Sequence, residues 1–191
     1  MAFSDSVWWT RKSRIQAEKR LLANSFQAQL LLLWYSFFAV CASLYYAQLD
    51  QATDSYGIAW IAFSVLILAM SGFISGLSFK ERASLIKECY ETLNDLYQRA
   101  TVEGAETDVL AKEYTQILSV CENHSDRDYY IAMCEAQLTH DPDKLDRHPT
   151  KYIWFLFLWY RVSRVVFLSV FYSLPVIIFI GLHCYDLAGK L

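Results

Sequence analysis

The sequence predicts an all-α integral membrane protein, built from a transmembrane helical hairpin, a cytoplasmic helical arm and a third, C-terminal apolar helix. Of its 191 residues, 55% are hydrophobic and only 19% are charged. The stretch from Leu21 to Phe79 contains no Lys, Arg or Glu and only two acidic residues, Asp50 and Asp54. A water-soluble domain rarely extends this far without a cation, so most of this stretch is expected to lie in lipid.

Two apolar segments make up the predicted hairpin, residues 26–79. The segments 26–47 and 56–79 each have about the 20 residues that a helix needs to cross a bilayer. Their apolar side chains fall on all sides of the helix, as is typical of helices surrounded by lipid or by other helices. The connection QLDQATDSY (48–56) has two Asp and no cation, whereas cations flank the hairpin. This charge pattern predicts that the N-terminus and residues 80–149 are cytoplasmic.

A basic amphipathic helix is predicted for residues 1–25, before the first span. Its cations are Arg11, Lys12, Arg14, Lys19 and Arg20. They are candidates for contact with a signal molecule or a partner protein. They could equally anchor the helix to anionic lipid, at about 1 kcal/mol per residue, and the sequence leaves both alternatives open.

Residues 80–149 are predicted to form a cytoplasmic helical region. Two stretches place apolar residues at steps of three and four, which puts them on one face of each helix. The first stripe contains Leu85, Cys89, Leu93, Leu96, Tyr97 and Ala100, and the second contains Val109, Leu110, Tyr114, Ile117, Leu118 and Cys121. We therefore expect a helical hairpin with a stop at Gly104, followed by a linker over residues 139–151.

The C-terminal residues 150–191 are predicted to contain an interfacial helix and then a third membrane span. The aromatic-rich stretch YIWFLFLWY is too short to cross, and Arg161 and Arg164 follow it at the expected level of the lipid headgroups. Residues 165–184 are long enough to span, although Pro175 removes one backbone hydrogen bond and should kink the helix. A re-entrant segment is the alternative.

The polar stretch CENHSDRDYY (121–130) is the strongest candidate for chemistry. Cys121 and His124 could act as nucleophile and base, but their spacing does not show an imidazole oriented by a third group. A capped turn between two helices explains the stretch more simply, because Ser125 and Asp128 have the spacing of a capping box. We favour the turn. The candidates in this stretch for contact with a signal or a partner are Asn123, His124, Asp126 and Asp128.

Composition and motifs argue against several other classes of protein. A net charge of -3 does not indicate the positively charged surface that binds nucleic acid. The five Cys are an odd number without a C-x-x-C pair, so neither a disulfide framework nor a zinc site is predicted. No phosphate-binding or hydrolase motif is present, so we expect no cofactor, no bound metal and no catalytic residue.

The second span carries a small-xxx-small pattern in two registers, which lets helix backbones approach closely in lipid. The pattern consists of Ser71, Gly72, Ser75 and Gly76. These residues could pack against another copy of the chain, could pack against the first span, or could simply be tolerated. Candidate pore-lining residues are Ser36, Ser43 and Ser64.

Two motifs and the order of the segments suggest a family. The motifs RKSRIQAEKR (11–20) and NHSDRDYY (123–130), around two spans, resemble the SLATT family of bacterial two-span membrane effectors. The resemblance covers nearly the whole chain, although the third apolar segment departs from a plain two-span pattern. It implies an inner-membrane protein of an anti-phage, abortive-infection system, which forms a pore or disrupts the membrane when a nucleotide signal or a sensor protein activates it.

Three functions follow from these observations. The leading expectation is a non-enzymatic effector that contacts membrane lipid and forms homo-oligomers. The alternative is a non-conducting membrane anchor or adaptor that recruits a cytoplasmic partner. A small membrane enzyme that uses Cys121 and His124 is the third interpretation, which we disfavour.

Overall fold

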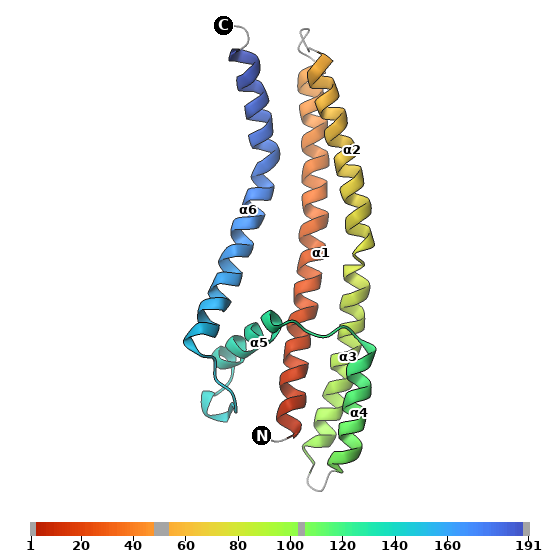
Figure 1. Ribbon diagram of the computed structural model, residues 1–191, viewed down its shortest axis with the longest axis vertical. Helices are drawn as coiled ribbons and strands as arrows, with labels where there is room; N and C mark the ends of the chain where they lie inside the picture. Colours follow the sequence, from red (N-terminus) through yellow and green to blue (C-terminus); the bar gives the residue numbers. More distant parts are fainter. Residues whose placement is uncertain (1–2, 48–53, 103–105, 189–191) are drawn as a thin grey trace. The chain divides into compact units, whose positions relative to one another are not determined.

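The computed structural model describes residues 3–47, 54–102 and 106–188, and the regular structure in them is all helical (Figure 1). This result confirms the predicted fold class. Three helical stretches are long and apolar enough to cross a membrane: Phe3–Tyr46, Ile58–Ala100 and Lys151–Tyr185. The expected stop at Gly104 and most of the connection after the first span lie outside the described residues.

The described helices belong to two compact units. In chain order they are α1 (Phe3–Ala47), α2 (Asp54–Gly76), α3 (Phe79–Ala100), α4 (Thr107–Val120), α5 (Asp126–Thr139), the short 3₁₀ helix η1 (Pro142–Lys144) and α6 (Lys151–Ala188). The first unit lies within residues 1–25 and 79–162, and the second within residues 26–78 and 163–191. The helices α1 and α6 therefore each contribute to both units.

Two helices are longer than the sequence segments suggested. The basic N-terminal segment and the first span are parts of one helix, α1. The expected interfacial helix and third span likewise form one helix, α6, with no break at Arg161 or Arg164. Arginine is a good helix former and no Gly or Pro lies beside these two positions, so no stop signal ends the helix there. The start of α6 is capped by Thr150, whose Oγ1 accepts a hydrogen bond from the Ile153 N–H at 3.3 Å.

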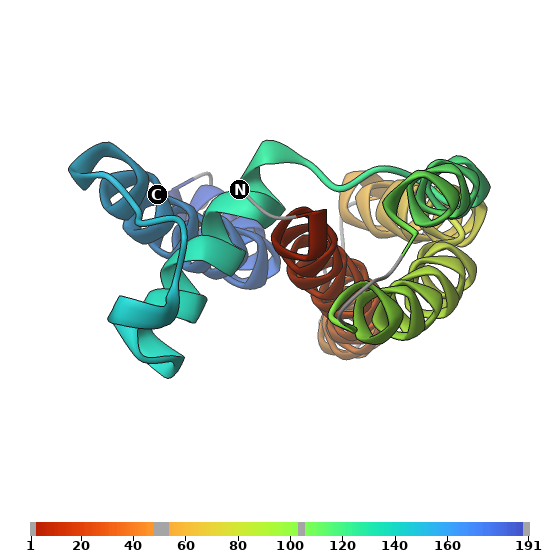
Figure 2. The ribbon, with the colours of Figure 1, turned by 90° about the horizontal axis from the view of Figure 1, so that it is seen from below.

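The core of the first unit is formed by α3, α4 and the beginning of α1. Figures 1 and 2 show α3 and α4 side by side as the two arms of the expected hairpin. Leu93 and Leu96 of α3 are fully buried and pack with Val7, Leu110 and Ile117. Apolar burial of this kind stabilises the unit by about 25 cal/mol for each Å² removed from water.

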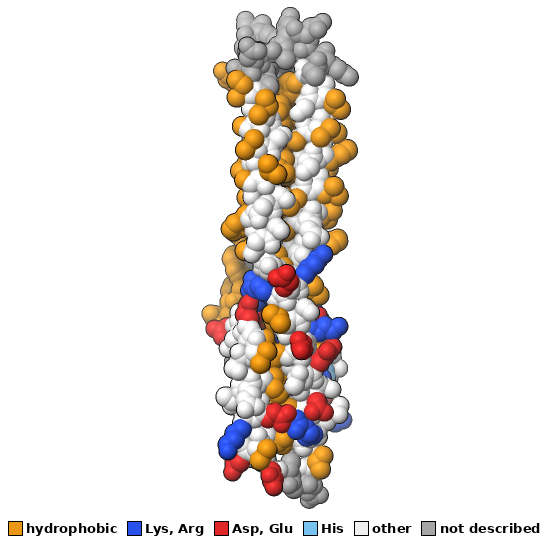
Figure 3. Space-filling view, turned by 90° about the vertical axis from the view of Figure 1, so that its right-hand side faces the viewer, with side chains coloured by type: hydrophobic (Ala, Val, Ile, Leu, Met, Phe, Trp, Pro, Cys, Tyr) orange, Lys and Arg blue, Asp and Glu red, His pale blue; other side chains and the backbone are white. Residues whose placement is uncertain are grey.

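The second unit has one small core and large exposed apolar faces. Ala42, Tyr46 and Trp60 are buried together, and Phe38 and Phe179 pack against them. On the face shown in Figure 3, the side chains over α2 are hydrophobic or uncharged, whereas the charged side chains gather over α3 and α4. Apolar surface of this extent requires lipid or further helices to cover it.

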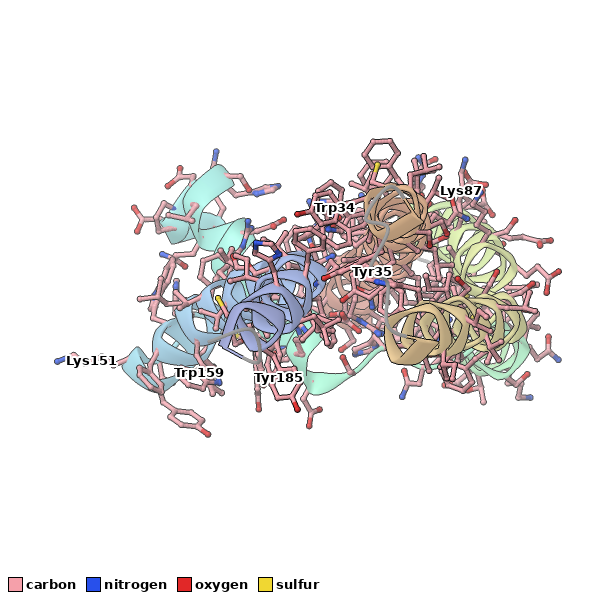
Figure 4. All side chains as sticks on the ribbon, turned by 90° about the horizontal axis from the view of Figure 1, so that it is seen from above. Trp34, Tyr35, Lys87, Lys151, Trp159 and Tyr185 are labelled. Carbon is pink, nitrogen blue, oxygen red and sulfur yellow. The ribbon has the colours of Figure 1, made fainter. Side chains whose placement is uncertain are left out.

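Helix α6 contains Pro175, and α1 supplies a donor that the proline lacks. Because proline has no N–H, the carbonyl four residues earlier, that of Phe171, loses its helical donor. The Tyr35 hydroxyl donates to Phe171 O at 2.7 Å, and Trp34 Nε1 donates to Tyr172 O at 3.1 Å. Figure 4 shows both side chains on α1. Each bond gives a carbonyl of α6 a donor from α1, so the two bonds hold α6 against α1.

Tyr35→Phe should therefore lower the stability of the protein by about 1 kcal/mol, because it removes the hydroxyl donor but keeps the ring. Thermal unfolding in detergent, followed by circular dichroism, measures the change. Tyr45→Phe is the matched control on α1, because the Tyr45 hydroxyl makes no hydrogen bond in the described part of the chain. Equal melting temperatures for the two variants would contradict the assigned role of Tyr35.

Candidate functional site

The structure joins the two groups of polar residues that the sequence singled out, the cations of α1 and the turn before α5. Arg20 of α1 forms a bidentate ion pair with Asp128, with Nε–Oδ1 at 2.9 Å and Nη2–Oδ2 at 3.0 Å. Gln16 Nε2 donates to Glu135 Oε2 of α5 at 2.7 Å. We call this region, together with Arg14 and its contacts, the α1–turn site.

Asp128 is fully buried and holds the turn and Arg20 at the same time. Its Oδ2 accepts from the Ser125 N–H at 3.0 Å and from the Ser125 hydroxyl at 2.7 Å. These contacts belong to a complete capping box, which confirms the sequence prediction, and α5 begins at Asp126. Burial by itself would raise the pKa of Asp128, but the hydrogen bonds from Arg20 and Ser125 outweigh burial and hold this pKa below its ordinary value.

Arg14 is the most deeply buried cation of α1, with 1% of its surface exposed. It lies seven residues from both Val7 and Leu21, which are also buried, so it falls on the same face of the helix. Its Nη1 donates to the sulfurs of Cys89 and Cys121, and its Nε has no hydrogen-bond partner in the described structure. The guanidinium of Arg14 is therefore buried inside the first unit, against two thiols.

The remaining cations of α1 lie closer to solvent. Arg11 donates to Asn94 Oδ1 of α3. Lys12 lies over the ring of Trp8, with its Nζ 5.1 Å from the ring centroid. The Lys19 side chain is 59% exposed and lies 3.5 Å from Glu135, a surface pair of the kind that adds little to stability. Lys19 is thus the most accessible of the five cations to lipid or to a partner.

Cys121 and His124 occupy the same turn, but no hydrogen bond joins them in the described structure. The Cys121 sulfur faces Arg14, the His124 N–H donates to Asn123 Oδ1 at 3.0 Å, and His124 Nδ1 is buried without a hydrogen-bond partner. A thiol nucleophile needs a base within reach and a group that orients that base. In the described residues no hydrogen bond joins the His124 ring to Cys121 or to a group that would orient the ring, and Asn123 and Asp126 are exposed beside the turn. Within the described residues, no group of three or more His, Cys, Asp or Glu side chains could hold a metal ion.

The protein should lose stability when the pH falls from 7.5 to 5.5. Burial, and then the positive charge of Arg14, lower the pKa of His124 below its ordinary value. The folded state therefore binds fewer protons than the unfolded state below about pH 6.5, and stability falls as the unfolded histidine takes up its proton. The measurement is the melting temperature in detergent at both pH values. A pH dependence that is unchanged in His124→Gln would contradict the assignment.

The small residues of α2 lie on exposed surface. Ser71, Gly72, Ser75 and Gly76 are all exposed, and a Cβ added at either glycine would meet no atom within 4 Å. In the described structure the surface around these four residues is therefore open.

The three candidate pore-lining serines are exposed as well. The Ser43 hydroxyl donates to Ala39 O at 2.8 Å, and the Ser64 hydroxyl donates to Trp60 O at 2.9 Å. Each hydroxyl donates its hydrogen to a carbonyl of its own helix. Ser43 and Ser64 therefore have only the lone pairs of their hydroxyl oxygens to present to other groups in this conformation. Ser36 is exposed on α1, seven residues before Ser43.

Taken together, the apolar helices and the α1–turn site define a helical membrane protein with a folded polar unit, made from segments that flank its hairpin. The chain belongs to the SLATT family: residues 2–181 match family 5 of the SMODS and SLOG-associating 2TM effector domains. The resemblance seen in the sequence is confirmed. The family is described as a two-transmembrane domain, and this chain has three helical stretches that could span. No curated protein and no solved structure matches the chain.

Proposed function

We propose that the chain is the membrane effector of a bacterial anti-phage system. In this proposal its spans assemble with other copies into a pore in the inner membrane when a nucleotide signal or a partner protein activates it. Membership of an effector family that associates with SMODS and SLOG supports the effector role. The cations that flank the hairpin favour a cytoplasmic N-terminus and a cytoplasmic location of residues 80–149.

The unused small-residue surface of α2 is the observation that carries the proposal. A Cβ at Gly72 or Gly76 would meet nothing, and the neighbouring side chains of Leu68 and Phe73 are 73% and 64% exposed. Because lipid provides no hydrophobic force between helices, association depends on close backbone packing at small residues. A second copy of the chain could use this surface, which the single chain leaves uncovered.

The path for ions would be only weakly polar. No charged residue lies between Tyr56 and Phe79, so selection would depend on pore size and on weak dipoles. Outward lone pairs of Ser43 and Ser64 are suitable dipoles, and Ser36 extends the row on α1. Activation in this proposal acts at the α1–turn site, where an anionic signal could compete with Asp128 for Arg20.

Flux from liposomes tests the proposal. The purified protein is reconstituted with an ion-sensitive dye and a self-quenched dye, with and without an activating nucleotide or partner. We expect ion release from the active wild type and none from Gly72→Ile/Gly76→Ile. Because a Cβ added at either position meets nothing within 4 Å, the double variant should fold normally.

Gly181→Ile on α6 is the matched control, because a Cβ at Gly181 also meets nothing within 4 Å. This variant should keep its ion flux. Normal flux in the Gly72/Gly76 double variant would reject the assembly role of α2. Sealed liposomes under every activator would reject the pore and favour the adaptor, whose test is the capture of a partner by residues 80–149.

A further inference from the structure

We propose that Cys89 and Cys121 form a thiol pair that a peroxide converts reversibly into a disulfide. This modification site goes beyond the effector function and does not depend on pore formation. Three observations carry it: the two sulfurs share one guanidinium, they belong to different elements of the first unit, and they differ in access to solvent.

The first observation is geometric. Arg14 Nη1 donates to both sulfurs, and because both bonds start at one nitrogen, the sulfurs lie within two hydrogen-bond lengths of each other. The Cys89 S–H also donates to Ile117 O at 3.4 Å, one helical turn before Cys121. Both sulfurs therefore lie at one place in the contact between α3 and α4, which a disulfide between them requires.

The second observation concerns the backbone. Cys89 lies in the middle of α3, whereas Cys121 is the C-cap residue of α4, with an extended backbone at φ -127° and ψ 159°. A residue just beyond a helix end can adjust without breaking helical hydrogen bonds. The movement needed for a disulfide therefore falls mainly on Cys121.

The third observation is the difference in access. Cys89 is buried, and Cys121 is partly exposed, so a small oxidant reaches Cys121 first. Burial, with a further contribution from the Cys121 thiol, raises the pKa of Cys89 to about 12, against the opposing charge of Arg14. Cys89 thus remains a thiol at neutral pH, so its proton has to leave as its sulfur attacks, and the hydroxide released from Cys121 accepts that proton.

The reaction balances with one molecule of hydrogen peroxide. Once Cys121 has lost its proton, its thiolate attacks a peroxide oxygen, the O–O bond breaks, a sulfenic acid and hydroxide form, and this hydroxide takes up the Cys121 proton as water. The Cys89 sulfur then attacks the Cys121 sulfur. The S–O bond breaks, and the leaving hydroxide takes the Cys89 proton as water. Two thiols lose two electrons in total, and the peroxide is reduced to two waters.

The disulfide would also change the environment of Arg14. The reduced thiols are the hydrogen-bond partners of its guanidinium, and a buried cation without partners is costly. The oxidised protein should therefore release the Arg14 segment of α1 from its buried position. Faster cleavage by trypsin after Arg14 is the expected sign of this release.

Peptide mapping of the full-length protein in detergent tests the proposal. The protein is treated with hydrogen peroxide, the remaining thiols are alkylated, and tryptic peptides are identified by mass spectrometry. We expect a peptide pair linked through Cys89 and Cys121, two hydrogens lighter than the reduced pair, that dithiothreitol separates. Arg14→Lys should form the link several-fold more slowly, because an ammonium cannot contact both sulfurs through one planar group.

Cys134 is the internal control, because it is buried and burial raises its pKa to about 11, but no arginine contacts its sulfur in the described residues. It should stay open to alkylation after unfolding. Oxidation of Cys121 to a sulfinic acid without the link would overturn the proposal, as would a link that joins Cys134 as often as Cys89. The map of the wild-type protein decides between these outcomes without any cysteine variant.

Discussion

Asp128→Ala is expected to lower the free energy of unfolding by about 3–5 kcal/mol, because it removes one partner of a buried ion pair. The Asp128 side chain is fully buried, and the Arg20 side chain is only 24% exposed, so the guanidinium would keep its desolvation cost without its carboxylate. The same change removes the acceptor of the Ser125 N–H and so breaks one half of the capping box of α5. Chemical unfolding in detergent measures the loss.

Asp126→Ala is the matched control, since Asp126 is an exposed residue of the same helical turn. Its loss should cost no more than about 1 kcal/mol, the usual value of an acidic residue at a helix N-terminus. A double variant, Arg20→Ala/Asp128→Ala, should cost less than the two single changes added together. Similar losses for Asp126→Ala and Asp128→Ala would contradict the role given to the ion pair.

The ion pair also predicts how the protein responds to strong acid. The pKa of Asp128 is held below its ordinary value in the folded state, so its stabilisation is present above about pH 4 and is lost as the pH falls through the lowered pKa. This window lies below the one assigned to His124. The two groups can therefore be separated by a pH titration of stability.

Leu93→Ala is expected to lower the free energy of unfolding by about 3 kcal/mol, because it leaves a cavity in the core of the first unit. Leu93 has no exposed surface and packs within the cluster that contains Leu96, Leu110 and Ile117. Chemical unfolding in detergent again gives the value. Leu85→Ala on the same helix should change stability by less than about 0.5 kcal/mol, because Leu85 is 51% exposed. An equal loss in both variants would contradict the position of the core.

Hydropathy was sufficient to predict the apolar helices and the fold class, because few environments other than lipid stabilise a long segment of uncharged, apolar residues. The buried face of α3 was predicted less accurately. The apolar stripe predicted for this helix includes Leu85, which is exposed, whereas Ile86, one residue further along the helix, is buried. Steps of three and four residues can be drawn through Leu85 or through Ile86, and the two sets lie on neighbouring faces of the helix. The packing against Ala17 and Leu21 of α1 determines which of these faces is buried.

The candidate site was predicted in parts but not as a whole. The capping box follows from the spacing of Ser125 and Asp128, because both residues belong to one turn. The pairing of Arg20 with Asp128 joins residues that are 108 positions apart, and a single sequence carries no local signal for it. The sequence contains a weak indication that Arg14 is buried, because Arg14 lies seven residues from both Val7 and Leu21. An analysis of charge alone does not detect this spacing.

The bond from Tyr35 to the Phe171 carbonyl makes positions 35 and 175 an epistatic pair. With proline at 175, the hydroxyl replaces a missing backbone donor, whereas with alanine at 175 the backbone N–H would be restored and the hydroxyl would be superfluous. The order of substitutions is therefore constrained. The proline is tolerated best in a chain that already has the tyrosine, and the tyrosine can be lost cheaply only after the proline has gone.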